Sequence, residues 1–122
     1  MFIVNCEVYP FDVLVYFGED GKPLYKELKK YLSKSEIKNL KNLDFKRGKT
    51  IMFDKGQTLL WLRKKPISIQ DIPVLNHEIF HCTCFILEKV GIPYSETTEE
   101  AYAYLIEFLS KKIYNQLEIT FS

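Results

Sequence analysis

The sequence predicts a single α+β domain in which antiparallel hairpins pack on amphipathic helices. Runs rich in Val, Ile, Phe and Tyr alternate with segments whose apolar residues recur at helical spacing. The chain has 122 residues, 47% of them hydrophobic and 15% aromatic, which is enough for one packed core. We expect one domain over 1–122, with a sheet and basic helices over 1–69 and a helical pair over 70–117.

The first part of the chain reads as a hairpin followed by two short helices. Residues 2–9 and 12–17 are rich in β-branched and aromatic side chains, which favours two paired strands. Pro23 suits the first turn of a helix, because its fixed φ is helical and its missing N–H is not needed there. Ser33 or Ser35 can cap a second helical piece.

A second hairpin is predicted in the middle of the chain. Two β-type runs, 49–54 and 57–63, are separated by Gly56, which can adopt the backbone conformation of a tight turn. Within the second run, residues 58–62 are apolar on both faces of the strand. This pattern indicates that other elements pack on both faces of the strand, or that one face is free to bind an extended segment.

Two longer helices are predicted after this hairpin. The first begins within 71–75 and ends at Gly91, which suits the residue after a helix end. The second packs on the first and runs to about Leu117, and residues 118–122 form a short β-prone tail. The apolar stripe expected along the first of these helices consists of Ile79, Phe80, Thr83, Ile86, Leu87 and Val90.

The first long helix carries the only two histidines of the chain, in the pattern H-E-x-x-H. His77 and His81 are four residues apart, so both imidazoles can reach one metal ion from the same helix face. Glu78 lies at the flank, where a carboxylate can reach a water molecule near that metal. This pattern is typical of zinc peptidases, in which Zn²⁺ lowers the pKa of its bound water from about 15.7 to roughly 7 and the glutamate takes the proton.

Two histidines do not complete a catalytic zinc site, which usually has three protein ligands. With no third histidine in the chain, the remaining ligand is a carboxylate, a cysteine or a tyrosine. Glu99 and Glu100 follow His81 on the next helix, which returns antiparallel. Cys84 lies on the histidine face and could make a closed structural site, although small buried residues are the preferred interpretation of both Cys82 and Cys84.

The two motifs together resemble a known group of enzymes. Residues 75–81, with the H-E-x-x-H pattern, and residues 99–105, Glu-Glu-Ala-Tyr-Ala-Tyr-Leu, are similar to small phage- or prophage-encoded H-E-x-x-H proteins of the gluzincin type. The ImmA/IrrE-type peptidases are a more distant likeness. The resemblance covers roughly residues 70–115 and implies a zincin-like fold, a zinc cofactor and Glu100 as third ligand, with Glu99 as the alternative.

Some features of the larger zinc peptidases are missing. Tyr104 stands four residues after Glu100, where thermolysin-like enzymes carry an aspartate. No histidine from a second domain is present to stabilise an oxyanion. That role would fall to Tyr94, to Tyr102 or to main-chain N–H groups.

Cysteine usage and hydropathy indicate where the protein resides. Its three cysteines, Cys6, Cys82 and Cys84, cannot all pair within the chain, which favours a reducing, cytoplasmic compartment. The first residues lack the basic and apolar regions of a signal peptide. No apolar run is long enough to span a membrane, so we expect no membrane partner.

The region between Lys22 and Lys49 contains ten basic residues and three acidic ones. Such a surplus could attract nucleic acid. However, aromatic residues and arginines are not interleaved with the lysines, which favours an ordinary solvated helix face.

The leading hypothesis is a zinc-dependent metallopeptidase acting on a peptide or protein substrate. His77, His81 and Glu100 would hold Zn²⁺, and Glu78 would act as general base. By analogy with zincins, strand 57–63 would run beside the cleft and pair with an extended substrate.

Two other functions remain open at this point. One is a non-catalytic, zinc-stabilised protein-binding module of phage or prophage origin, which would bind metal without hydrolysing peptides. The other, less favoured, is a nucleic-acid-binding protein that uses the basic segment 22–49. Steep dependence of binding on salt would support the latter.

Overall fold

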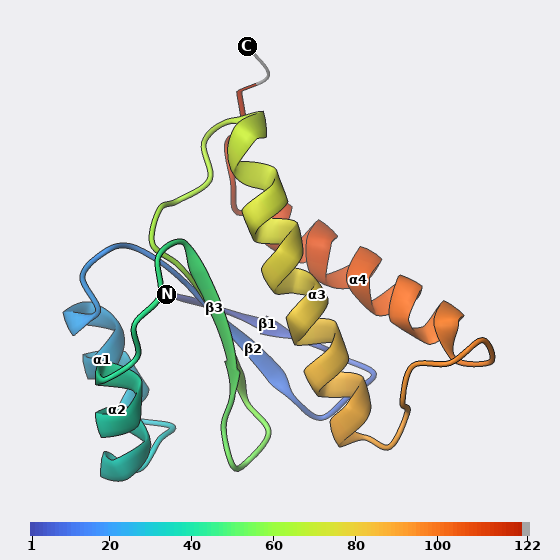
Figure 1. The fold of residues 1–122 in the computed structure, drawn as a ribbon, viewed down its shortest axis with the longest axis horizontal. Helices are drawn as coiled ribbons and strands as arrows, with labels where there is room; N and C mark the ends of the chain where they lie inside the picture. The colour runs from blue at the N-terminus through green and yellow to red at the C-terminus, as the bar shows by residue number, and fades with distance from the viewer. Residues whose placement is uncertain (121–122) are drawn as a thin grey trace.

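The computed structural model describes residues 1–120 and contains one mixed four-stranded sheet with helices on both faces (Figure 1). Its small α+β architecture confirms the predicted fold class at this level. In chain order the elements are β1 (Phe2–Asn5), β2 (Asp12–Phe17), α1 (Lys22–Leu28), α2 (Lys34–Lys41), β3 (Gly48–Met52), β4 (Thr58–Leu62), the 3-10 turn η1 (Ile69–Asp71), α3 (Ile72–Lys89) and α4 (Glu99–Tyr114).

The sheet consists of the two predicted hairpins joined side by side. β1 pairs antiparallel with β2, and β3 pairs antiparallel with β4. The hairpins meet through a parallel pairing of β2 with β4, in which Val15 lies opposite Leu60, giving the order β1-β2-β4-β3. This parallel join was not predicted, because it connects strands separated by α1, α2 and β3 in the chain.

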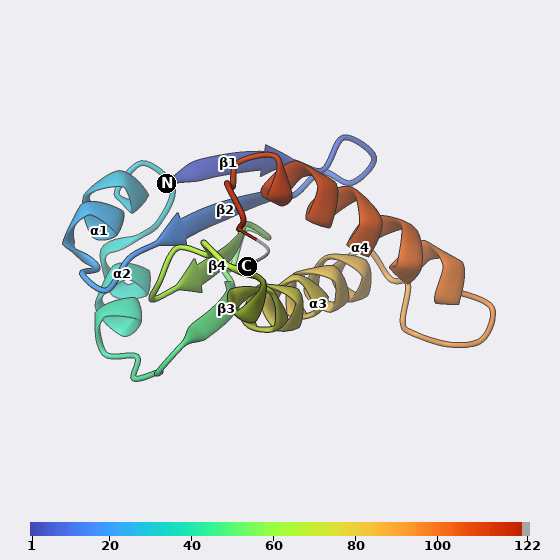
Figure 2. The same ribbon diagram turned by 90° about the horizontal axis from the view of Figure 1, so that it is seen from above.

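The strand β4 lies inside the sheet and is buried on both faces. Leu59 and Trp61 belong to the core under α1 and α2, whereas Leu60 and Leu62 belong to the core under α3 and α4. Figure 2 shows these two helical layers on opposite sides of the sheet. The apolar run 58–62 therefore has cover on each side, and the prediction that this strand borders a cleft and pairs with substrate is wrong.

The short helices form where their capping residues predict them. Proline occupies the first turn of α1. Ser33, rather than Ser35, caps α2: its hydroxyl accepts a hydrogen bond from the Glu36 N–H, and the Glu36 carboxylate accepts one from the Ser33 N–H. This reciprocal pair satisfies two main-chain donors that a helix start leaves free. The other oxygen of the Glu36 carboxylate accepts a hydrogen bond from the Asp54 N–H, which joins α2 to the chain just after β3.

The helical pair differs from the prediction in detail. Of the predicted stripe on α3, Phe80 is 51% exposed, because Glu78 rather than Phe80 turns toward the core. α4 ends at Tyr114, three residues before the predicted Leu117. From the predicted tail, Thr120 makes a parallel bridge with Ser68, while residues 121–122 lie outside the described part of the chain. Among the described residues, no helix is long and apolar enough to cross a membrane.

Candidate metal centre

The start of α3 is held by the turn that precedes it. The Asp71 carboxylate accepts hydrogen bonds from the N–H groups of Ile67, at 2.9 Å, and Ser68, at 3.1 Å. These bonds lower the pKa of Asp71, the Ile67 bond being the larger cause. Pro73 lies in the first turn of α3, where its missing N–H costs nothing. Together, the Asp71 hydrogen bonds and Pro73 fix where α3, the helix that carries the motif, begins.

The two histidines of the motif lie together on the outer side of α3. The Nε2 atoms of His77 and His81 are 3.1 Å apart, and their ring planes are inclined at 73°. Two nitrogens bound to one tetrahedral zinc ion at normal bond lengths would be about 3.3 Å apart. The observed separation fits such a pair with little adjustment. On its other side, His81 stacks on Phe85, with ring centroids 6.2 Å apart.

Glu78 is buried, with only 5% of its surface exposed, and it turns from α3 toward β3. Its Oε1 accepts a hydrogen bond of 2.7 Å from the Thr50 hydroxyl. Its Oε2 lies 3.9 Å from His77 Nε2. The carboxylate is therefore next to the histidine pair, as the motif predicts, but it is held by a strand rather than lying free at the flank of the helix.

Two residues of β3 shape the surroundings of Glu78, and neither was predicted from sequence. Thr50 supplies the hydroxyl, and Gly48 supplies the space. A Cβ atom on Gly48 would be 3.0 Å from Glu78 Cγ and 2.8 Å from Leu62 Cδ2, closer than side chains normally pack. In the sequence, the one sign of this contact is a glycine at the start of a β-prone run. The contact itself cannot be predicted locally, because the packing of β3 against α3 depends on the tertiary fold.

A pocket of about 390 Å³ opens beside the first turns of α3. It is lined by Arg47, Gly48, Pro73, Val74, His77 and Glu78. The pocket brings a histidine, a carboxylate and an arginine around one space. Arg47 was not singled out in the sequence, yet its position allows it to attract a negatively charged group in this pocket.

The two tyrosines considered for oxyanion stabilisation lie elsewhere. The Tyr102 hydroxyl donates a hydrogen bond of 2.8 Å to the carbonyl of Ile92, and Tyr94 packs edge-on against Tyr102. Ile92 follows the C-terminal end of α3, about three turns beyond His81. Neither tyrosine is placed near the histidine pair, so that assignment is corrected, and Arg47 or main-chain N–H groups are closer candidates.

The predicted third ligand lies in the first turn of α4. Both Glu99 and Glu100 are exposed there. Because α4 returns antiparallel, with Tyr114 near its end donating a hydrogen bond to Asn76, its first turn lies at the far end of α3. Within residues 1–120, no group of three His, Cys, Asp or Glu side chains is arranged so that it could hold a metal ion. The structure thus does not bring Glu100 to the pair, and its role as a ligand stays a prediction.

The cysteines are mainly buried, as expected. Cys6 and Cys82 are in the core, and Cys84 is half-buried. Burial, with a smaller contribution from Asp12, raises the pKa of the Cys6 thiol to about 11. Burial likewise raises the pKa of Cys82 and Cys84. Raised pKa values favour protonated thiols rather than thiolate ligands.

The basic residues between Lys22 and Lys49 are all exposed. Those on α1 and α2 project from the face of each helix opposite its buried leucines, among them Leu24 and Leu40. This is the arrangement of a solvated helix face.

The strand next to the candidate site has an open edge, because β3 is the outermost strand of the sheet. Hydrogen bonds from Arg63 N–H to the Arg47 carbonyl, at 2.9 Å, and from Phe53 N–H to the Gln57 carbonyl, at 2.8 Å, define which residues face β4. Antiparallel pairing alternates, so the intervening residues Gly48, Thr50 and Met52 point their N–H and C=O groups outward.

The chain matches no protein-family model, no curated protein and no solved structure. The geometry of His77, Glu78, His81 and the strand beside them is therefore the basis for a proposed function.

Proposed function

We propose that this chain is a zinc-dependent metallopeptidase with a zincin-like arrangement of helix and strand. The observation that supports it most strongly is the close Nε2 pair of His77 and His81, beside a buried carboxylate, Glu78, that a threonine holds in place. The helical period alone brings the two histidines together, so the stronger part of this support is the burial of Glu78 beside them and its hydrogen bond to Thr50, which a coincidental H-E-x-x-H sequence would not require.

Zinc is proposed to be held by His77 and His81, with Glu100, which the structure does not bring to the pair, kept as the predicted third ligand. When bound, the metal would supply Lewis acidity that polarises a substrate carbonyl and makes water more acidic.

The other roles belong to the protein itself. Glu78 accepts a proton from the attacking water and delivers it to the leaving amine. Thr50 bonds Oε1, which fixes the carboxylate so that Oε2 is the atom on the side of His77. Arg47 and the main-chain N–H groups of the pocket are positioned to attract the negative charge that develops on the substrate oxygen.

An extended peptide is the proposed substrate, paired with β3 rather than β4. The outward N–H and C=O groups of Gly48, Thr50 and Met52 offer main-chain hydrogen bonds along the edge of the sheet. Since Gly48 and Thr50 also contact Glu78, a peptide bound here would pass directly beside the general base. The three free thiols fit a cytoplasmic location for this activity.

The proposal is tested by measuring bound zinc and peptide hydrolysis in the same preparations. Native protein should bind about one equivalent of zinc, and His77→Ala and His81→Ala should each lose it. Glu78→Gln should keep the zinc and lose hydrolysis of a quenched-fluorescence peptide library by about a hundredfold or more. Glu88→Gln, which changes an exposed glutamate further along α3, is the matched control and should keep both properties. Unchanged hydrolysis in Glu78→Gln would contradict the mechanism.

A second function deserves the same experiment because no group of three His, Cys, Asp or Glu side chains among residues 1–120 is arranged so that it could hold a metal ion. A non-catalytic zinc-stabilised module would bind the metal, lose stability on addition of a chelator and hydrolyse none of the library peptides. Such a module would use the same open edge of β3 to bind a protein segment.

A further inference from the structure

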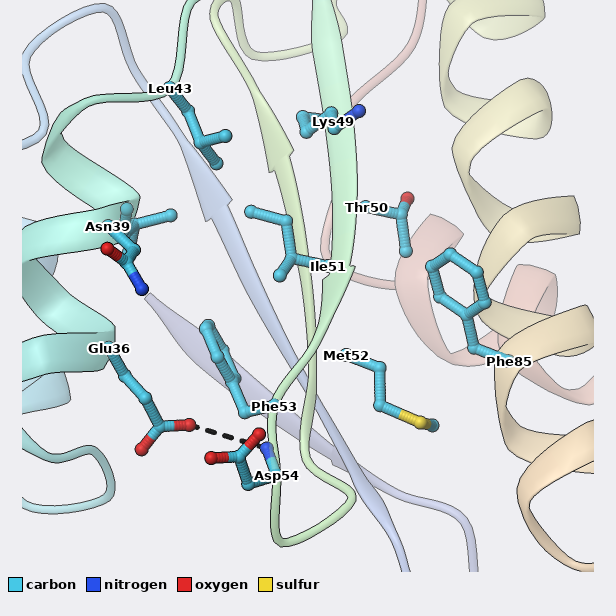
Figure 3. Close-up of a pocket in the computed structure, with 11 residues that line it drawn as sticks. Glu36, Asn39, Leu43, Lys49, Thr50, Ile51, Met52, Phe53, Asp54 and Phe85 are labelled. Atoms are coloured by element: carbon cyan, nitrogen blue, oxygen red, sulfur yellow. Dashed lines mark hydrogen bonds between the residues drawn. The ribbon is translucent and has the colours of Figure 1, made fainter.

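A groove of about 410 Å³ runs along the open edge of β3, between α2 and Phe85 of α3. Figure 3 shows the strand passing through the middle of the groove, with Asn39 and Leu43 on the α2 side and Phe85 on the α3 side. Native proteins usually cover or charge an exposed strand edge, because it invites pairing with another chain. Here β3 carries one exposed charge, Lys49, and a helix flanks the edge on each side.

The side chains of β3 and the residue after it alternate between the two sides of the groove. Thr50 and Met52 point toward α3, whereas Ile51 and Phe53 point toward α2 (Figure 3). The main-chain groups directed into the groove belong to Thr50 and Met52, as the pairing with β4 dictates. A peptide strand pairing with them would also send successive side chains to opposite sides.

We infer that the groove selects substrates by an apolar side chain held on the α2 side, in a pocket made by Leu40, Leu43, Ile51 and Phe53. This inference rests on the proposed function, because it names a determinant of the peptide that Glu78 would cleave. The occupant is an extended segment of another polypeptide, with a residue such as leucine or phenylalanine opposite Ile51.

An extended peptide fits this groove better than a helix or a small molecule. The groove offers main-chain donors and acceptors at two-residue spacing, which only another strand can match along its length. Its α2 wall is apolar where the side chain would enter: Leu43 is 37% exposed, and Leu40 and Phe53 form a buried floor. The nearby Glu36 carboxylate already accepts hydrogen bonds from the N–H groups of Ser33 and Asp54. It is therefore engaged within the protein and does not make this side of the groove a site for a polar side chain.

The groove and the candidate metal centre share two residues. Thr50 lines the groove and donates its hydroxyl to Glu78, while Phe85 lines the groove and stacks on His81. A peptide paired with β3 would therefore lie in the groove and also beside the candidate metal centre. Its apolar residue opposite Ile51 would lie about three residues from the bond placed beside Gly48 and Glu78, and on the opposite face of the strand.

Binding of short labelled peptides, measured by fluorescence anisotropy on the Glu78→Gln protein, tests this without requiring cleavage. The probes consist of threonine and glutamine with a single leucine, phenylalanine or serine at the centre. The leucine and phenylalanine probes should bind about tenfold or more tightly than the serine probe. Leu43→Glu, made in the same background, should abolish that preference, while Ile3→Glu on the far edge strand β1, matched in exposure, should retain it.

The outcomes separate this inference from the proposed function. An apolar preference that is lost in Leu43→Glu supports the pocket, whether or not the native protein binds zinc. Equal binding of the three probes, or a preference unaffected by Leu43→Glu, overturns the pocket even if zinc-dependent hydrolysis is found. A concentration-dependent dimer in sedimentation equilibrium that excludes the probes would show that a second copy occupies the edge, and it would also overturn the inference.

Discussion

The Thr50 hydroxyl donates a 2.7 Å hydrogen bond to Oε1 of Glu78, joining the edge strand β3 to the helix α3. Both residues are buried, Thr50 with 6% and Glu78 with 5% of its surface exposed. A buried carboxylate without a partner is costly, so this bond stabilises the fold and orients the proposed base together. The position of the motif's carboxylate thus depends on a residue 28 positions earlier in the chain.

Thr50→Val should destabilise the protein by about 1–3 kcal/mol, because it removes the hydrogen bond of a buried carboxylate at nearly constant volume. Thr50→Ser, which keeps a hydroxyl, should recover part of the loss. Thr58 on β4 is the matched control: its hydroxyl is buried with no hydrogen-bond partner among the described residues, so Thr58→Val should be neutral or stabilising. Urea denaturation measures all three, and equal losses at the two positions would contradict the role of Thr50.

Gly48→Ala should strongly reduce the rate of peptide hydrolysis while lowering the free energy of unfolding only slightly. The added methyl group would press on Glu78 Cγ and Leu62 Cδ2 and displace the carboxylate from its place beside His77. Gly91→Ala provides the comparison, since a Cβ there meets nothing within 4 Å but the residue has φ +84°. That change should cost about 1 kcal/mol of folding stability and leave kcat unaltered. If Gly48→Ala hydrolyses peptides at the native rate, Gly48 has no part in positioning Glu78.

Glu100→Gln should weaken zinc binding if Glu100 is the third ligand, because a neutral amide is a poor substitute for a carboxylate on Zn²⁺. Titration with a competing chelator measures the affinity. Glu99→Gln and Cys84→Ser examine the alternatives, and Glu107→Gln, an exposed position two turns along α4, is the control. If only Cys84→Ser lowers the affinity, the site is a structural one closed by a thiolate.

The buried thiols should make stability fall under alkaline conditions. The pKa of Cys6 rises on folding from its ordinary value of 9.0 to about 11, so the unfolded chain releases this proton first. Stability from this group is complete below pH 9.0 and is lost as pH rises toward about 11. Thermal denaturation from neutral to alkaline pH should show this decline, and Cys6→Ala should have a shallower one. An unchanged slope in Cys6→Ala would exclude this cause.

The local features of the fold were predictable because their causes are local. Both antiparallel hairpins, a serine cap at Ser33 or Ser35 and the span of α3 follow from turn residues, capping residues and apolar periodicity. The closeness of His77 and His81 follows from the helical period alone. These features involve residues near one another in the chain, so the sequence pattern encodes them directly.

The identity of the strand beside the candidate site could be read only from the packing of the whole chain. Sequence favoured the apolar run that became β4, but the parallel pairing of β2 with β4 places that strand inside the sheet and leaves β3 at its edge. Thr50 and Gly48 became partners of Glu78 for the same reason. Likewise, the antiparallel return of α4 places Glu100 far from the histidine pair. Local sequence patterns were enough to predict the chemical groups of the motif and the helix that carries them. What surrounds these groups depends on the packing of distant segments, because no local pattern records a contact between separate elements.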